Sequence, residues 1–140
     1  MILLDASGLV AAIDQSERNH ARLADFVRGT TDRLILSPFV LAEVDYLVAR
    51  HAGLDAELAL LDEVSRGTYE LAQFAGEELA DARAVIVRYR DLGIGLADAS
   101  IVVLAGKLRT NRVLTLDERH FRTLRTPDRK PFELLPADAA

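Results

Sequence analysis

Short apolar runs, each followed by a segment with helical periodicity, limit the folds that this chain can adopt. Residues 2–4, 34–36 and 113–115 consist of aliphatic or β-branched residues, a pattern typical of short strands buried in a sheet. Further strands are expected at 69–71 and 132–135. Because these strands alternate with helical segments, the sequence predicts an α/β domain with a mainly parallel sheet of four to five strands.

Capping residues and helix breakers set the expected helix boundaries. Ser37 and Pro38 stand in the order that favours a helix start, and Gly53 ends the same helix. Asp5 and Ser7 are suitable caps for a first helix. The helices are expected to cover residues 8–14, 20–28, 39–51, 55–65, 76–90 and 97–108, with a short one around Arg119 and Phe121.

Length and composition are those of one globular domain over residues 1–140. Half of the residues are hydrophobic, which provides enough apolar material for a core and excludes bulk disorder. The absence of cysteine excludes disulfides, thiolate zinc sites and cysteine nucleophiles. The N-terminus has no basic segment and no apolar run is long enough to cross a membrane, so we expect a cytoplasmic protein without a membrane partner.

Charge is distributed unevenly along the chain. The net charge of −5 argues against general nucleic-acid binding, but residues 107–130 contain eight basic and only three acidic side chains. An acidic body with a basic flank can still hold a polyanion. Arg112, Arg119 and Arg122 are therefore candidates for contacts with a phosphate backbone, and a solvated charged face is the alternative interpretation.

Four carboxylates stand where strand and helix ends can bring them together. Asp5 follows the first strand and Asp117 follows the strand at 113–115. Asp98 opens the most apolar helix, and Glu43 lies beside the apolar stripe of its own helix. The carboxyl ends of parallel strands meet at one edge of a sheet, so we expect the four side chains to converge there.

Each of these acids also has a simpler interpretation. The three aspartates could act only as helix caps or first-turn acids. Glu43 could pair with Arg50 or face water. Considered together, however, clustered carboxylates would repel one another unless a cation neutralised them.

A divalent cation is therefore expected at the cluster. Oxygen ligands without His or Cys favour Mg²⁺ or Mn²⁺ over zinc, and such an ion serves phosphoryl hydrolysis. The three histidines, His20, His51 and His120, are not expected to be metal ligands. His120 stands closest to the proposed site.

The segments that carry these acids resemble the PIN-domain ribonucleases, and more narrowly the VapC toxins of bacterial toxin–antitoxin pairs. The resembling segments are Leu3-Leu4-Asp5-Ala6-Ser7, Ala42-Glu43-Val44, Leu96-Ala97-Asp98-Ala99, and Leu114-Thr115-Leu116-Asp117 with Phe121. The resemblance covers nearly the whole chain. One departure from the family pattern is His120, which stands where many relatives carry an aspartate before the final phenylalanine.

The resemblance implies a Rossmann-like α/β/α sandwich and an endoribonuclease that depends on Mg²⁺ or Mn²⁺. It implies that Asp5, Glu43, Asp98 and Asp117 form an acidic quartet that holds the metal and carries catalysis. Ser7 and Thr115 match supporting polar residues. A VapB-like antitoxin, an RNA substrate and a homodimer are the partners that the family suggests.

Two other function classes compete with this hypothesis. A non-catalytic metal- or RNA-binding α/β module, either a degenerate nuclease or a receiver-like domain, would share the acids. A receiver also needs a lysine on a late strand, a requirement that Lys107 and Lys130 meet poorly. A phosphatase with an aspartate nucleophile needs Asp-x-Asp, where this chain has Asp5-Ala6-Ser7.

Overall fold

Five short parallel strands form the middle layer of the computed structural model, which describes residues 1–139. The strands are β1 (Ile2–Leu4), β2 (Leu34–Leu36), β3 (Glu70–Leu71), β4 (Arg112–Leu114) and β5 (Glu133–Leu135). Their order across the sheet is β3-β2-β1-β4-β5, and every neighbouring pair is parallel. The predicted α/β class and sheet type are thereby confirmed.

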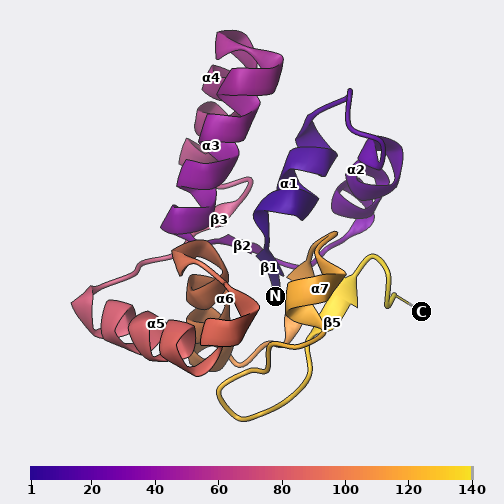
Figure 1. Cartoon of the computed structure of the whole chain (residues 1–140). Helices are drawn as coiled ribbons and strands as arrows, with labels where there is room; N and C mark the ends of the chain where they lie inside the picture. The colour runs from indigo at the N-terminus through magenta and orange to yellow at the C-terminus, as the bar shows by residue number, and fades with distance from the viewer. Residues whose placement is uncertain (140) are drawn as a thin grey trace.

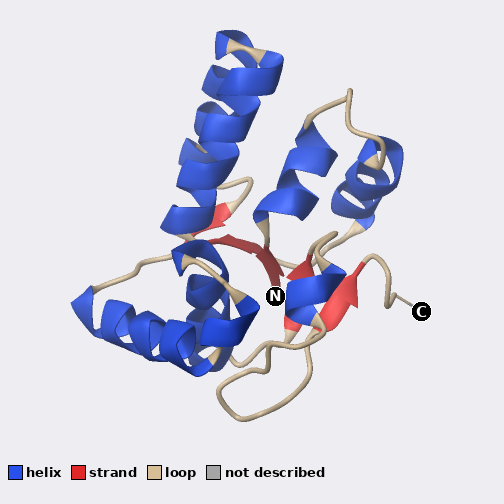
Figure 2. Ribbon diagram, in the orientation of Figure 1, coloured by secondary structure: helices blue, strands red, loops and turns tan. Residues whose placement is uncertain are grey.

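Helices cover both faces of this sheet (Figures 1 and 2). In Figure 1, α1 to α4 rise above the strands, whereas α5 and α6 lie below them. Right-handed connections explain the two layers, because the chain steps from β1 to β3 in one direction and then crosses back to β4. The helices are α1 (Ala6–Ile13), α2 (His20–Gly29), α3 (Pro38–Ala52), α4 (Leu54–Ser65), α5 (Gly76–Arg88), α6 (Leu96–Leu108) and α7 (Glu118–Phe121), with a 3-10 turn over Arg90–Leu92.

The direction of the chain across the sheet reverses between β1 and β4. The chain leaves β1 toward β2, and it later returns to pair β4 with the opposite side of β1. Asp5 extends this pairing, since its backbone N–H donates to the Leu114 carbonyl over 3.0 Å. In open α/β sheets, ligands bind beyond the carboxyl ends of the strands at such a reversal. Asp5 and Thr115, which directly follow β1 and β4, lie at this position.

Apolar burial holds the middle of the sheet in place. The residues of β1 are at most 1% exposed, and those of β2 are at most 2% exposed apart from Leu34. Burying one such aliphatic side chain contributes about 2 kcal/mol. The edge strand β3 is instead exposed. Arg33, just before β2, makes a salt bridge of 2.6 Å to Glu70 of β3.

The start of α3 follows the predicted rule, whereas the start of α1 does not. Ser37 accepts a hydrogen bond from the Phe39 N–H, with proline in the first turn. Helix α1 begins at Ala6, two residues earlier than expected. Asp5 occupies its N-cap position, but the Asp5 carboxylate turns to Ser7 and Thr115 instead of capping the helix. The carboxylate thus takes part in a contact with the distant Thr115 and leaves the first turn of α1 without a side-chain cap.

Helix α5 also ends earlier than predicted. It stops at Arg88, and a 3-10 turn follows before Gly93 adopts a left-handed conformation with φ of 72°. Glycine tolerates this conformation without steric cost, so the break falls before α6. None of the helices in residues 1–139 combines the length and the apolar character that a membrane crossing needs.

We predict that Gly8→Ala destabilises the protein, because a Cβ at Gly8 would lie 2.5 Å from the Leu114 carbonyl oxygen. That backbone atom cannot move aside without disturbing β4. The free energy of unfolding in urea is expected to fall by about 2 kcal/mol. Gly29→Ala is the matched control, since a Cβ there meets no atom within 4 Å among the described residues. Equal stability of the two variants would contradict the prediction.

Candidate active site

Two hydroxyl groups hold the Asp5 carboxylate at the end of β1. Ser7 Oγ and Thr115 Oγ1 each donate to Asp5 Oδ2 over 2.7 Å. Both hydroxyls also accept from backbone N–H groups, Ser7 from Leu116 and Thr115 from Asp117. The first strand, the first helix and the segment after β4 are thus joined around one buried carboxylate.

Burial raises the pKa of Asp5, and it does so more strongly than its hydrogen bonds lower it. The charge of Asp117 adds to the increase in this pKa. An ionised carboxylate in this position is costly without a positive partner. The environment of Asp5 therefore favours a cation beside it.

Asp98 reaches the same region from the first turn of α6. The beginning of α6 is fixed to the beginning of α3 by a buried hydrogen bond of 2.7 Å between the hydroxyls of Ser100 and Ser37. Burial, followed by the negative charge of Asp5, raises the pKa of Asp98 to about 6. Its carboxylate contacts His120, so helix capping does not account for its orientation.

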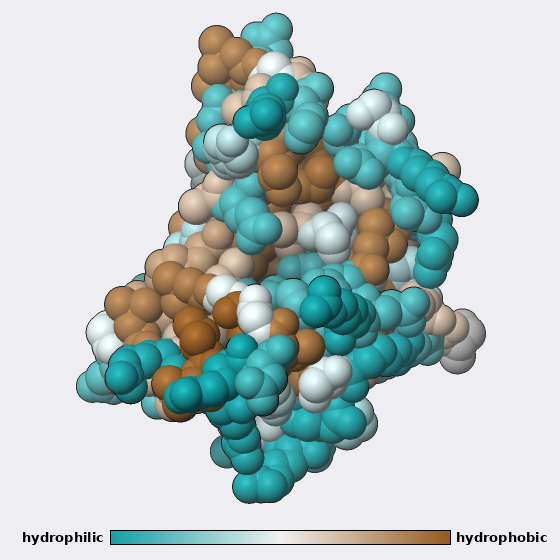
Figure 3. Space-filling model, viewed as in Figure 1, coloured by the Kyte–Doolittle hydropathy of each residue, from teal (hydrophilic) through white to brown (hydrophobic). Residues whose placement is uncertain are grey.

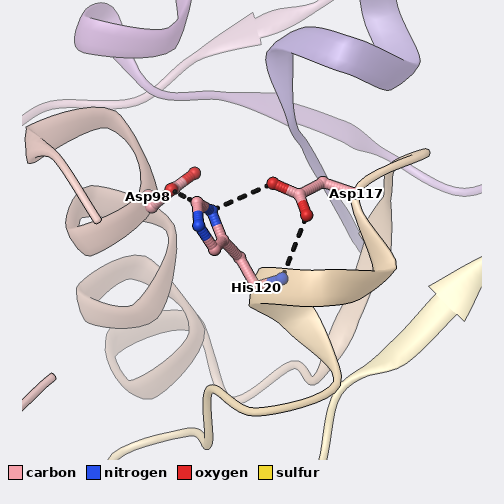
Figure 4. Close-up of side chains that lie close together, drawn as sticks. All are labelled: Asp98, Asp117 and His120. Atoms are coloured by element: carbon pink, nitrogen blue, oxygen red, sulfur yellow. Dashed lines mark hydrogen bonds and ion pairs between the residues drawn. The ribbon is translucent and has the colours of Figure 1, made fainter. Parts of the chain in front are cut away.

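Asp117 performs two tasks with its two oxygens (Figure 4). Oδ1 accepts a hydrogen bond of 3.0 Å from the His120 backbone N–H and thereby caps α7. Oδ2 lies 3.0 Å from Nδ1 of the His120 ring. The capping interpretation from the sequence is therefore correct, and it coexists with a place in the acidic cluster.

His120 is the residue of this region that the sequence reasoning did not assign to the metal site. Its Nδ1 lies 3.0 Å from Asp98 Oδ2 as well as from Asp117 Oδ2, as Figure 4 shows. One ligand atom from each of the three residues lies within 4.8 Å of the others. The available signal was the spacing of Asp117 and His120, since residues three apart share one face of a helix.

Glu43 approaches from α3 and remains more open to solvent than the other acids. Partial burial and then the charge of Asp5 raise the pKa of the Glu43 carboxyl. Arg50, the salt-bridge partner considered from the sequence, donates to the Tyr46 hydroxyl instead. Glu43 is thus close enough to Asp5 to be affected by its charge.

The four acids predicted from the sequence share one electrostatic environment at the carboxyl edge of the sheet. Asp5 raises the pKa of both Glu43 and Asp98, and Asp117 acts on both Asp5 and Asp98. Their carboxylate oxygens, with one imidazole nitrogen, are donors that suit a divalent cation. The arrangement can hold such an ion beside a phosphate group.

The three candidate arginines lie in different surroundings. Arg112 begins β4, at the opposite end of that strand from Thr115, and bonds to Asp32 at 2.7 Å. Arg122 is held by Glu118 and Asp138. Arg119 is exposed on α7, next to His120. Among the described residues, Arg119 is thus the candidate whose guanidinium makes no salt bridge.

Comparisons with known proteins place this chain in a family and agree with its fold. The sequence pattern of the PIN domain family matches residues 2–126. The chain is 43% identical over 135 residues to Ribonuclease VapC26 of Mycobacterium tuberculosis (strain ATCC 25618 / H37Rv), covering 96% of this chain and 100% of that protein. The chain therefore belongs to the PIN domain family. Within that family it groups with the VapC ribonucleases, as the resemblance had indicated.

Solved structures with low sequence identity share the fold. The crystal structure of M. tuberculosis VapC20, described as a sarcin-ricin loop cleaving toxin, superposes with a TM-score of 0.78 at 18% identity, over 84% of this chain and 90% of that chain. A chain of Rickettsia felis VapBC2, solved with a DNA fragment from its promoter, gives 0.66 at 21% identity, over 96% and 98% of the two chains. The α/β/α sandwich is thus the fold of VapC structures.

We predict that Asp98→Asn stabilises the metal-free protein at pH 8. The pKa of Asp98 is raised in the folded state to about 6 from 3.8, so the carboxyl destabilises the fold progressively between these pH values and fully above about 6. The expected gain is about 2 kcal/mol in the free energy of unfolding, measured in urea with EDTA. The difference should shrink as the pH falls below 6 and vanish well below 3.8, where the wild-type carboxyl is protonated in both states.

Asp81→Asn is the control for this comparison, because Asp81 is an exposed acid of α5. Its stability should follow that of the wild type across the same pH range. A loss of stability in Asp98→Asn at pH 8 would show that the His120 contact outweighs burial and the charge of Asp5.

Proposed function

We propose that the protein is the toxin of a VapBC pair, an endoribonuclease that depends on Mg²⁺ or Mn²⁺. The observation that carries the proposal is the convergence of Asp5, Asp98 and Asp117 where the sheet reverses direction, with Glu43 close to Asp5. This geometry occurs in a chain that belongs to the PIN domain family. The chain also matches the whole length of a VapC ribonuclease. Fold, site chemistry and relatives support the same activity.

In this proposal the four acids have different roles in the reaction. Asp5, Asp98 and Asp117 would hold the ion, directly or through water, while Ser7 and Thr115 keep Asp5 oriented. Glu43 would complete the ligand set or accept a proton from the attacking water. When bound, a divalent cation lowers the pKa of water and neutralises charge on a phosphoryl oxygen. Attack by water, without use of the RNA 2′-hydroxyl, would leave 5′-phosphate and 3′-hydroxyl ends.

RNA would approach over the basic flank of the molecule. Arg119 is exposed on α7, next to His120 in the sequence, and we propose that its guanidinium contacts a phosphate there. Arg112 and Arg122 are engaged with carboxylates, so we assign them weaker roles than Arg119. Sequence choice would then depend on loop shape and on unpaired bases.

The α3–α4 hairpin offers apolar surface for protein partners. Its exposed apolar residues, each at least 40% exposed, are Tyr46, Leu54, Leu58 and Leu61. Figure 3 shows apolar surface at the tip of this hairpin and between the hairpin and α1. We propose that a VapB-like antitoxin and a second copy of the chain cover such surface, since an amphipathic helix lies readily in an apolar groove.

The catalytic proposal predicts RNA cleavage only with Mg²⁺ or Mn²⁺ present. Asp5→Asn and Asp98→Asn should each lower the cleavage rate by about a hundredfold or more, because each removes a charged ligand. The measurement is the rate of fragment formation on total RNA, with Asp81→Asn as the control that keeps activity. Full activity in excess EDTA would exclude the metal mechanism.

A second outcome separates catalysis from mere binding. A folded protein that binds either ion and RNA but leaves the RNA intact would identify the non-catalytic module instead. Sequencing the 5′ ends of fragments formed in cells would show which RNA is cut.

The toxin assignment predicts that expression of the protein alone inhibits growth. Co-expression of a small protein encoded beside it should restore growth. That small protein should co-purify with this chain. Asp5→Asn should be harmless when expressed to the same soluble level. Unchanged growth on strong induction of the soluble wild-type protein would contradict the assignment.

A further inference from the structure

The ring of His120 lies between two carboxylates of the acidic cluster. Its Nδ1 is 3.0 Å from Asp98 Oδ2 and 3.0 Å from Asp117 Oδ2, as drawn in Figure 4. We infer that His120 binds the divalent cation through Nδ1 and gives the site a preference for Mn²⁺ over Mg²⁺. This inference rests on the proposed metal-dependent function and adds a nitrogen ligand to the four acids.

The spacing of the three atoms suits a common ion. Neighbouring ligands of an octahedral ion, with bonds of about 2.1 Å, lie about 3 Å apart. Nδ1 has this separation from both carboxylate oxygens, and the three atoms all lie within 4.8 Å of one another. Small side-chain movements would be enough to bring them around one ion.

Hydrogen bonding by a neutral imidazole satisfies only part of this arrangement. A neutral imidazole carries one N–H, so Nδ1 has at most one hydrogen to offer. Two carboxylate oxygens face that nitrogen at the same distance, and they must share the hydrogen. A cation would instead interact favourably with both oxygens and with the nitrogen lone pair.

Helix α7 fixes the direction of the ring. The His120 backbone N–H donates to Asp117 Oδ1, which leaves Oδ2 of that carboxylate facing the ring nitrogen. The adjacent Phe121 is fully buried and packs edge-on against Phe132, with ring centroids 5.6 Å apart. His120 is therefore attached to an anchored turn, and its side chain is still 20% exposed to an entering ion.

The nitrogen ligand changes which ion the site prefers. Mg²⁺ is a hard cation that favours oxygen ligands, whereas imidazole suits transition metals. An aspartate at position 120 would restore a cluster with oxygen ligands alone. The identity of this residue thus tunes metal choice without altering Asp5, Glu43, Asp98 or Asp117.

The test measures the metal complex itself, without RNA. Purified wild type, His120→Asp and His51→Gln are loaded with Mn²⁺ or Mg²⁺, and affinities are taken from calorimetry. Pulsed EPR on the Mn²⁺ forms then detects coupling to a directly bound ¹⁴N. His51→Gln is the matched control, because His51 is an exposed residue in the last turn of α3.

We expect ¹⁴N coupling in the wild type and in His51→Gln, and its loss in His120→Asp. The ratio of Mn²⁺ to Mg²⁺ affinity should fall roughly tenfold or more in His120→Asp, while Mg²⁺ binding is retained. Wild-type protein labelled with ¹⁵N-histidine gives the same test without a substitution, since its coupling should change to that of ¹⁵N.

A Mn²⁺-loaded wild type without nitrogen coupling would overturn the inference. So would an unchanged affinity ratio in a folded His120→Asp variant. A different result would contradict the proposed function: wild-type protein that shows nitrogen coupling but does not cleave RNA with either ion. Cleavage in Mg²⁺ without nitrogen coupling in Mn²⁺ would retain the nuclease and reject the role of His120.

Discussion

The buried carboxylate of Asp5 is the constraint on which this site depends. It directly follows the central strand β1, where it is buried and accepts from two hydroxyl donors, Ser7 and Thr115. These donors orient the carboxylate but do not neutralise it, and burial still raises its pKa. A negative charge held in this way is stabilised by a nearby cation, and the same holds for the other acids of the cluster.

The rest of the fold places those other acids against Asp5. Parallel pairing of β1 with β4 brings the segment of Asp117 beside Asp5, and the hydroxyl contact of Ser37 with Ser100 sets the starts of α3 and α6 side by side. Close packing at Gly8 lets the first helix approach β4. Like charges are therefore gathered by apolar packing and by backbone pairing, which provide the stability that their repulsion costs.

Asp117 shows why a helix cap and a metal ligand are not exclusive roles. A carboxylate has two oxygens, and here one satisfies the first turn of α7 while the other faces the cluster. Capping also orients the residue, because it removes rotational freedom from the side chain. Helix α7 thereby acts as a small platform that presents Asp117 and His120 together.

The sequence by itself determined the strand positions, most helix boundaries and the four acids, because aliphatic runs, capping residues and motif spacing are local properties. The tertiary structure decided what the side chains do. The Asp5 carboxylate does not cap α1 and accepts from the hydroxyl of Thr115, 110 positions away. His120 of α7 meets Asp98 of α6, 22 positions away. Such contacts depend on how the strands, α6 and α7 pack in space, and no local sequence pattern encodes that packing.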